Sequence, residues 1–268
     1  MTEMSKENWG AGDPYELYVG RWSRKVAVEF LDWISVPARA AWADVGCGTG
    51  ALTQCILARC NLRSIAGIDK AEGFIATARQ AVADSRVTFD TGDAAKLPWE
   101  TDTFDAAVSG LVLNFVPDPH KMLSEIMRVT RSGGKVAVYV WDYAGAMEMM
   151  RHFWDAAIAV SPNDSKLDQA ERFPICQPER LEALFTDTGL KAVSSRSIEV
   201  PTVFKNFDDY WIPFLGKQGT APTYLASVNE EIREKIRARL LARLLPSVDG
   251  TIPLRARAWA VQGTVPSQ

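Results

Sequence analysis

The sequence predicts an α/β fold: a doubly wound sheet of seven strands, mostly parallel with an antiparallel closing strand, plus helical cap insertions. Three observations carry this prediction. Short apolar runs alternate with longer amphipathic runs between Ala41 and Trp141, which is the pattern of βαβ units. A glycine-rich turn stands where the first strand meets the first helix. Two β-branched stretches near the end of the chain, Lys191–Val203 and Leu254–Val265, predict the closing strands.

The alternating region divides into five strands joined by helices. The predicted strands are Ala41–Val45, Ser64–Asp69, Arg86–Thr91, Phe104–Ser109 and Lys135–Trp141. Apolar residues recur at helical spacing between them and predict helices over Ala51–Arg59, Glu72–Val82 and His120–Thr130. We expect Ser132-Gly133-Gly134 to end the last of these helices, because glycine accepts the left-handed conformation of a helix C-terminus.

The pattern loosens beyond Trp141 and predicts inserted segments. A helix is expected near Ala146–Val160, a loop over Ser161–Pro178 and a further helix over Pro178–Thr188. We therefore expect one domain over residues 1–268 with two kinds of segment. Its core comprises residues 38–142, 178–203 and 251–265, and its cap segments comprise residues 1–26, 143–177 and 204–250.

Composition argues against several classes of protein. With 47% hydrophobic and 24% charged residues, the chain lies outside the disordered range. A net charge of −3 supplies no broad cationic surface, so nucleic acid is not an expected partner. The absence of a signal-like or membrane-spanning apolar run predicts a cytoplasmic protein without stable membrane association. The four cysteines lack metal or disulfide spacing, so we expect free thiols and no metal.

The turn after the first strand is the strongest local signal of a ligand site. Its sequence is Asp44-Val45-Gly46-Cys47-Gly48-Thr49-Gly50. Glycines let the backbone bend tightly and approach a ligand, and the N-terminus of the following helix favours a polar ligand. The same turn fits the loose dinucleotide-binding pattern, with Asp69 at the spacing of a ribose-binding acid, so a nicotinamide-dependent oxidoreductase stays open.

The second half of the predicted sheet favours another interpretation. The informative segments are Gly92-Asp93-Ala94, Lys96-Leu97-Pro98-Trp99, Phe104-Asp105-Ala106, Glu125-Ile126-Met127-Arg128-Val129 and Arg131-Ser132-Gly133-Gly134. In this order, they resemble the class I S-adenosylmethionine-dependent methyltransferases, a family with a Rossmann-like fold. The resemblance is to the small-molecule branch related to ubiquinone and menaquinone methyltransferases, the type 11 methyltransferase domain.

This resemblance implies a cofactor, S-adenosyl-L-methionine, and a role for each part of the site. The glycine turn would approach the methionine part of the cofactor. Asp69 would hold the ribose hydroxyls, and Asp93 with Ala94 would face the adenine amino group. The predicted cofactor-binding residues are Arg21, Asp44, Gly46, Cys47, Gly48, Gly50, Asp69, Lys70, Asp93, Ala94 and Ser109.

The segment before the first strand resembles the lid of the same family. It is rich in tyrosine and carries Arg21-Trp22-Ser23-Arg24. We expect Arg21 to pair with the cofactor carboxylate through its planar fork. Phe115 stands where many relatives have a histidine, so no general base is expected there. Candidate catalytic residues are Tyr15, Tyr18 and His152.

The predicted function is transfer of the sulfonium methyl group to a small, partly apolar or aromatic acceptor by in-line displacement. Alignment carries much of the acceleration in such a reaction. Tryptophans of the cap segments either line the acceptor pocket or fill the cap core; they are Trp9, Trp22, Trp154 and Trp211. The alternatives are the oxidoreductase and a non-catalytic S-adenosylmethionine-binding protein. No oligomeric state is predicted.

Overall fold

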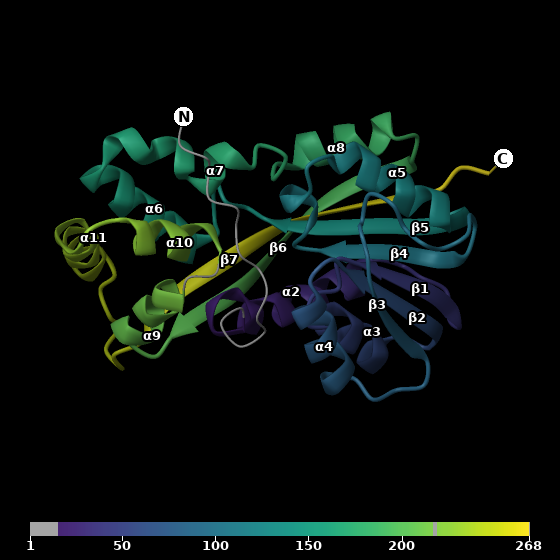
Figure 1. The fold of residues 1–268 in the computed structure, drawn as a ribbon, viewed down its shortest axis with the longest axis horizontal. Helices are drawn as coiled ribbons and strands as arrows, with labels where there is room; N and C mark the ends of the chain where they lie inside the picture. The colour runs from purple at the N-terminus through teal and green to yellow at the C-terminus, as the bar shows by residue number, and fades with distance from the viewer. Residues whose placement is uncertain (1–15, 217–218, 268) are drawn as a thin grey trace. The chain divides into compact units, whose positions relative to one another are not determined.

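The computed structural model describes residues 16–216 and 219–267, which contain a seven-stranded sheet (Figure 1). The strand order is β3-β2-β1-β4-β5-β7-β6. The strands are β1 Ala40–Val45, β2 Leu62–Asp69, β3 Val87–Thr91, β4 Phe104–Gly110, β5 Thr130–Trp141, β6 Lys191–Phe204 and β7 Ile252–Thr264. Strands β1 to β5 pair in parallel, whereas β7 runs antiparallel to β5. The predicted fold class is confirmed.

The helices, in chain order, are α2 Arg21–Trp33, α3 Ala51–Arg59, α4 Glu72–Ala81, α5 Pro119–Val129, α6 Glu148–Val160, α7 Gln169–Arg172, α8 Pro178–Asp187, α9 Phe207–Trp211, α10 Thr220–Ser227 and α11 Glu230–Arg243. A short π-helix, η1, spans Glu16–Gly20. Short 3-10 helices are η2 Leu113–Phe115, η3 Pro162–Leu167 and η4 Ile212–Gly216.

The described residues form two compact units. The sheet unit comprises residues 23–141, 175–198 and 258–267. The helical unit comprises residues 16–22, 142–174, 199–216 and 219–257. Strands β6 and β7 each contribute residues to both units. The predicted division of one domain into core and cap segments stays a prediction.

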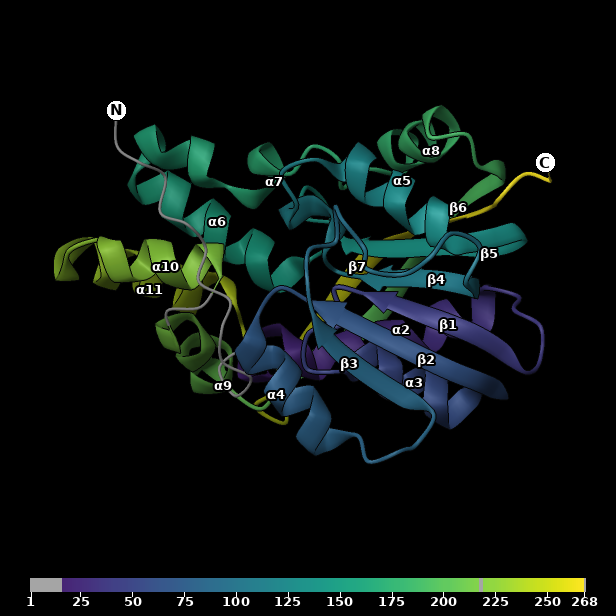
Figure 2. The same ribbon diagram turned by 45° about the vertical axis from the view of Figure 1, so that its right-hand side comes forward.

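Helices cover both faces of the sheet unit, which explains why its central strands read as apolar runs. Figure 2 shows α3 and α4 on one face and α5 and α8 on the other. Every residue of β1 is buried, as expected for a parallel strand covered on both sides. Helix α5 begins with Pro119 after Asp118, whose side chain accepts a hydrogen bond from the Lys121 N–H.

Two predictions about connecting segments are wrong. Helix α5 ends at Val129, and Thr130 is already extended, so Ser132-Gly133-Gly134 does not end it. These residues lie in the irregular first part of β5, where the register against β4 shifts and Gly133 has φ 74°. The expected loop over Ser161–Pro178 contains η3 and α7, because the Asp168 side chain accepts from the Ala170 N–H and caps α7.

Aromatic side chains fill the core of the helical unit. Phe153 stacks on Phe214 with ring centroids 4.6 Å apart, and Tyr18 meets Phe214 edge-on at 5.6 Å. Trp154 is 1% exposed and donates from Nε1 to Gln169 Oε1 at 3.1 Å. Within the described part of the chain, no helix is both long and apolar enough to cross a membrane.

Candidate functional site

The glycine turn joins β1 to α3 with three residues in the left-handed region. The φ angles are 77° at Gly46, 54° at Gly48 and 84° at Gly50. A Cβ on Gly46 would lie 2.6 Å from Val112 Cγ2, so the segment after β4 packs directly against the turn. A Cβ on Gly48 would meet no described atom within 4 Å. The turn is therefore closed at Gly46 and open at Gly48.

Asp69 at the end of β2 holds this turn in place. Its Oδ2 accepts from the Gly48 N–H at 3.0 Å, and its Oδ1 accepts from the Ala71 N–H at 2.9 Å. Burial raises the pKa of Asp69, and the two backbone hydrogen bonds oppose that rise. A carboxylate has about four lone-pair positions, so Asp69 retains capacity for a ligand.

Asp44 is the buried carboxyl group beneath the turn. Its Oδ2 accepts from Thr53 Oγ1 at 2.7 Å, while its Oδ1 is buried without a hydrogen-bond partner among the described residues. Burial raises the pKa of Asp44 to about 7; the hydrogen bond from Thr53 lowers it, and the charge of Asp69 raises it further. A cation next to Oδ1 would satisfy this oxygen and favour its ionised form.

Polar side chains from the end of β4 add to this edge of the sheet. Strands β1 and β4 pair side by side, with Asp44 opposite Val108. Ser109 is 1% exposed, and its Oγ has no partner in the described part of the chain. From β1, the chain adds β2 and β3 on one side of the sheet and then β4 and β5 on the other. The topological switch point therefore lies between β1 and β4, and open α/β sheets bind ligands at such points.

Asn114 in η2 is not among the cofactor-binding residues predicted from the sequence. It is 8% exposed, and neither its amide nitrogen nor its amide oxygen has a hydrogen-bond partner among the residues described. The preceding Leu111 has φ 63°, an unusual conformation for a residue other than glycine. One sequence signal for Asn114 exists, because it is the single polar residue in the apolar run 111–116.

Three other predicted cofactor residues of the sheet unit differ in how far their side chains are exposed. Asp93 is exposed, and its Oδ1 accepts from the Ala95 N–H at 2.9 Å. Lys70 is exposed as well. Cys47 is buried in an apolar cluster, and burial raises the pKa of its thiol well above the ordinary value, so it contributes as a small hydrophobe. A contact from its backbone to the cofactor stays a prediction, as do the predicted roles of the other selected residues.

Among the candidate lid and catalytic residues, Tyr18, Arg21, Trp22 and His152 lie in the helical unit, whereas Ser23 and Arg24 belong to the sheet unit. Arg21 Nη1 donates to Asp209 Oδ1 at 2.9 Å, and its guanidinium carbon lies 4.5 Å from the centre of the Trp22 ring. Tyr18 belongs to the aromatic core. Burial, together with the Arg243 cation, lowers the pKa of His152. Tyr15 and Trp9 lie outside the described residues.

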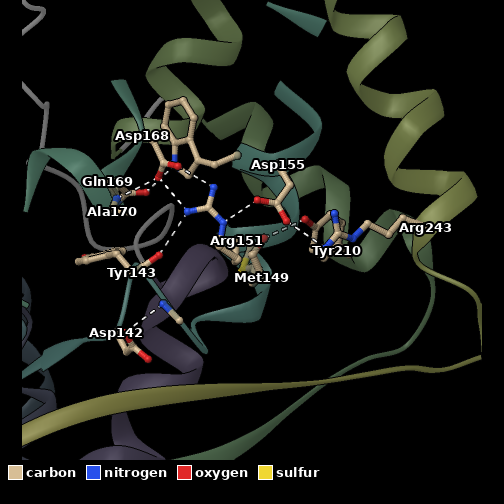
Figure 3. Close-up of polar contacts among 12 residues, drawn as sticks. Asp142, Tyr143, Met149, Arg151, Asp155, Asp168, Gln169, Ala170, Tyr210 and Arg243 are labelled. Atoms are coloured by element: carbon tan, nitrogen blue, oxygen red, sulfur yellow. Dashed lines mark hydrogen bonds and ion pairs between the residues drawn. The ribbon is translucent and has the colours of Figure 1, made fainter. Parts of the chain in front are cut away.

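A partly buried arginine joins three elements of the helical unit (Figure 3). Arg151 on α6 donates from Nη1 and Nη2 to the two carboxylate oxygens of Asp168, at 3.1 and 2.6 Å. Its Nε donates to Asp155 at 2.7 Å, and Asp155 also pairs with Arg243 of α11 at 2.9 Å. This arrangement fixes the start of α7 and α11 against α6; we call it the Arg151 cluster.

Comparison with known proteins identifies a family match within the sheet unit. A family model described as a methyltransferase domain matches residues 43–138. Residues 43–138 belong to the methyltransferase domain family. The match contains the glycine turn, Asp69, Asp93 and Ser109. The predicted class I methyltransferase family is thereby confirmed at the level of this domain.

Two curated relatives and one solved structure illustrate the similarity of this methyltransferase domain. The chain is 37% identical over 139 residues to 2-methyl-6-phytyl-1,4-hydroquinone methyltransferase 2 of Oryza sativa, covering 51% of this chain and 39% of the relative. It is 34% identical over 117 residues to demethylmenaquinone methyltransferase of Shouchella clausii, covering 42% and 48% respectively. The chain therefore spans less than half the length of these relatives.

The solved structure is that of phosphoethanolamine N-methyltransferase 2 from Haemonchus contortus in complex with S-adenosyl-L-methionine. Its TM-score is 0.58 at 18% identity, and the alignment covers 96% of this chain and 56% of that one. At this identity, the similarity establishes the shared fold.

Proposed function

We propose that this protein transfers the methyl group of S-adenosylmethionine to a small aromatic acceptor of the quinol type. One observation carries the proposal. An open glycine turn lies at the β1/β4 switch point of a methyltransferase domain, held by Asp69 on one side and underlain by the unsatisfied Asp44 oxygen. The turn and the two carboxyl groups are complementary to a ligand with a ribose and an ammonium group.

The residues at this edge fit the polar parts of the cofactor. Asp44 Oδ1 is a buried acceptor that an α-ammonium group would satisfy. The open side of Gly48 leaves room for a ligand against the backbone. Asp69 has capacity for the ribose hydroxyls, and Asp93 with Ala94 would face the adenine. Further contacts are proposed for Arg21, Gly46, Cys47, Gly50, Lys70 and Ser109.

Positioning would account for much of the catalysis. The cofactor supplies a methyl group on a sulfonium, which is already a good leaving group. The chain's part is to hold the acceptor in line with that methyl group, and this alignment supplies several kcal/mol of the barrier reduction. Tyr18 and His152 remain candidates for contacting the acceptor, and Tyr15 is a third candidate outside the described residues.

The choice of a quinol-type acceptor follows from two sources. The relatives cited above act on a phytyl hydroquinone and on demethylmenaquinone according to their names. The chain itself is rich in aromatic residues, with nine tryptophans, eleven phenylalanines and six tyrosines. Aromatic side chains are common in pockets for small apolar ligands. A substituted hydroquinone is therefore the first acceptor to test.

The experiment is to incubate the full chain with S-adenosylmethionine and a panel of substituted hydroquinones and phenols. We expect S-adenosylhomocysteine to form with at least one quinol, together with a product that carries one added methyl group by mass spectrometry. Phenols in which every candidate position is blocked serve as controls. Formation of S-adenosylhomocysteine without a methylated product would contradict the proposed acceptor class, and binding without turnover would favour the non-catalytic alternative.

A further inference from the structure

Unsatisfied polar atoms concentrate at one place in the sheet unit. Asp44 Oδ1, Ser109 Oγ and both amide atoms of Asn114 are buried without hydrogen-bond partners among the described residues. All three residues belong to β1, β4 or the turn directly after β4, and β1 and β4 pair with each other. A buried polar group without a partner destabilises the free protein, so the grouping of such atoms at the switch point indicates a polar ligand.

The segment that carries Asn114 packs against the glycine turn through Val112. Val112 precedes Asn114 by two residues, and Val112 Cγ2 would lie 2.6 Å from a Cβ on Gly46. Asn114 is 8% exposed, so most of its carboxamide is removed from solvent. The left-handed Leu111 sets the path of the chain between β4 and Asn114. A strained residue of this kind persists where the surrounding structure requires it, and such residues cluster at ligand sites.

The hydrogen-bonding groups of a carboxamide limit the kind of ligand group that Asn114 can bind. Asn114 offers two N–H donors and one acceptor oxygen at one point. An α-amino acid group presents the complementary pair, since its carboxylate accepts and its ammonium donates. Asp44 lies on β1, the strand that pairs with β4, and its unsatisfied oxygen supplies a second acceptor for the ammonium.

We infer that Asn114 binds the α-amino-acid end of the cofactor, donating to its carboxylate and accepting from its ammonium group. This inference rests on the proposed function and adds a binding residue to it. Asn114 therefore acts on binding of the cofactor. The apolar variant Asn114→Leu should therefore have a lower affinity for the cofactor and a free protein that is at least as stable as the wild type.

The test compares two ligands that differ at this end. S-adenosylhomocysteine carries the amino acid group, and 5′-methylthioadenosine lacks it. Isothermal titration of the full chain should show that Asn114→Leu weakens S-adenosylhomocysteine binding roughly ten- to hundredfold and leaves 5′-methylthioadenosine binding unchanged. The melting temperature of the ligand-free variant should equal or exceed that of the wild type, because two unsatisfied polar atoms are removed.

Thr202→Val is the matched control, because Thr202 Oγ1 is also buried without a partner in the described part of the chain but lies in β6. It should leave both affinities unchanged. Asn114→Ala replaces the leucine variant if the latter does not fold. Equal loss for the two ligands, unchanged S-adenosylhomocysteine affinity, or loss confined to acceptor turnover would overturn the inference. Failure of the wild type to bind S-adenosylhomocysteine would instead overturn the proposed function.

Discussion

Asp44 couples the candidate ligand site to the stability of the free protein. The carboxyl group is buried, one of its oxygens is satisfied by Thr53, and the other has no partner among the described residues. Burial is the main reason that its pKa rises from 3.8 to about 7. Near neutral pH, the free protein therefore holds a partly ionised carboxylate in surroundings that favour the neutral form.

This shift predicts a pH dependence with a definite sign. Between pH 3.8 and about 7, the folded chain keeps a proton on Asp44 that the unfolded chain has released. The free energy of unfolding contributed by this group therefore falls as pH rises through that window. Asp44→Asn removes the effect and keeps an acceptor for Thr53. Urea unfolding should show that the free energy of unfolding falls more between pH 5 and pH 8 for the wild type than for the variant. An equal fall in the two proteins would refute the raised pKa of Asp44.

Asp69 is expected to contribute more to cofactor binding than Asp93. Asp69→Ala should weaken S-adenosylmethionine binding by on the order of 1.5–3 kcal/mol, because a charged acceptor for the ribose hydroxyls is lost. The variant also removes the acceptor of the Gly48 N–H, which loosens the turn. Asp93→Ala should cost less, since water can replace a single contact of an exposed carboxylate. Calorimetric titration gives both values, and a larger loss at Asp93 would reverse the two roles.

At the scale of elements, alanine variants of two glycines can distinguish an effect on ligand binding from an effect on stability. Gly48 and Gly133 both have positive φ, at 54° and 74°, and a Cβ on either would meet no described atom within 4 Å. Alanine at each should therefore cost a similar amount of stability, roughly 1 kcal/mol. Gly48→Ala should in addition weaken S-adenosylmethionine binding, because the Cβ would occupy the open side of the turn. Equal affinities of the two alanine variants would show that the ligand does not approach Gly48.

The Arg151 cluster should be a main source of stability in the helical unit. Arg151→Met would leave the buried Asp168 without its bidentate partner, and losing one member of a buried pair costs about 3–5 kcal/mol. Arg243→Met at the more exposed rim should cost under about 1 kcal/mol. Urea unfolding of both variants measures the difference. Similar small losses would mean that the cluster is solvated and contributes little.

At the scale of the whole molecule, the sequence predicted the sheet well because its strands are covered on both faces. Such strands appear as short apolar runs, and the helix predicted over Ala51–Arg59 has the same bounds as α3. The glycines near residue 133 misled the prediction for a physical reason. Glycine with a positive φ occurs both at the end of a helix and where the register shifts within a strand, and Gly133 is of the second kind.

The parts of the site that the sequence did not predict depend on contacts between distant residues. Asn114 becomes a candidate once β1 is known to pair with β4 and Val112 to pack on Gly46. Arg151 and Asp168 are 17 positions apart and meet because η3 and α7 return the chain to α6. Neither relation is contained in local periodicity or in a motif, because both arise from tertiary packing.

The central claim is that the β1/β4 edge of the methyltransferase domain binds S-adenosylmethionine. Calorimetric titration of S-adenosylmethionine into the full chain, with and without excess NAD, tests it most directly. We expect one saturable site whose affinity NAD does not change and which Gly48→Ala weakens. No binding of S-adenosylmethionine, or displacement of it by NAD, would contradict the claim and return the glycine turn to the dinucleotide-binding interpretation.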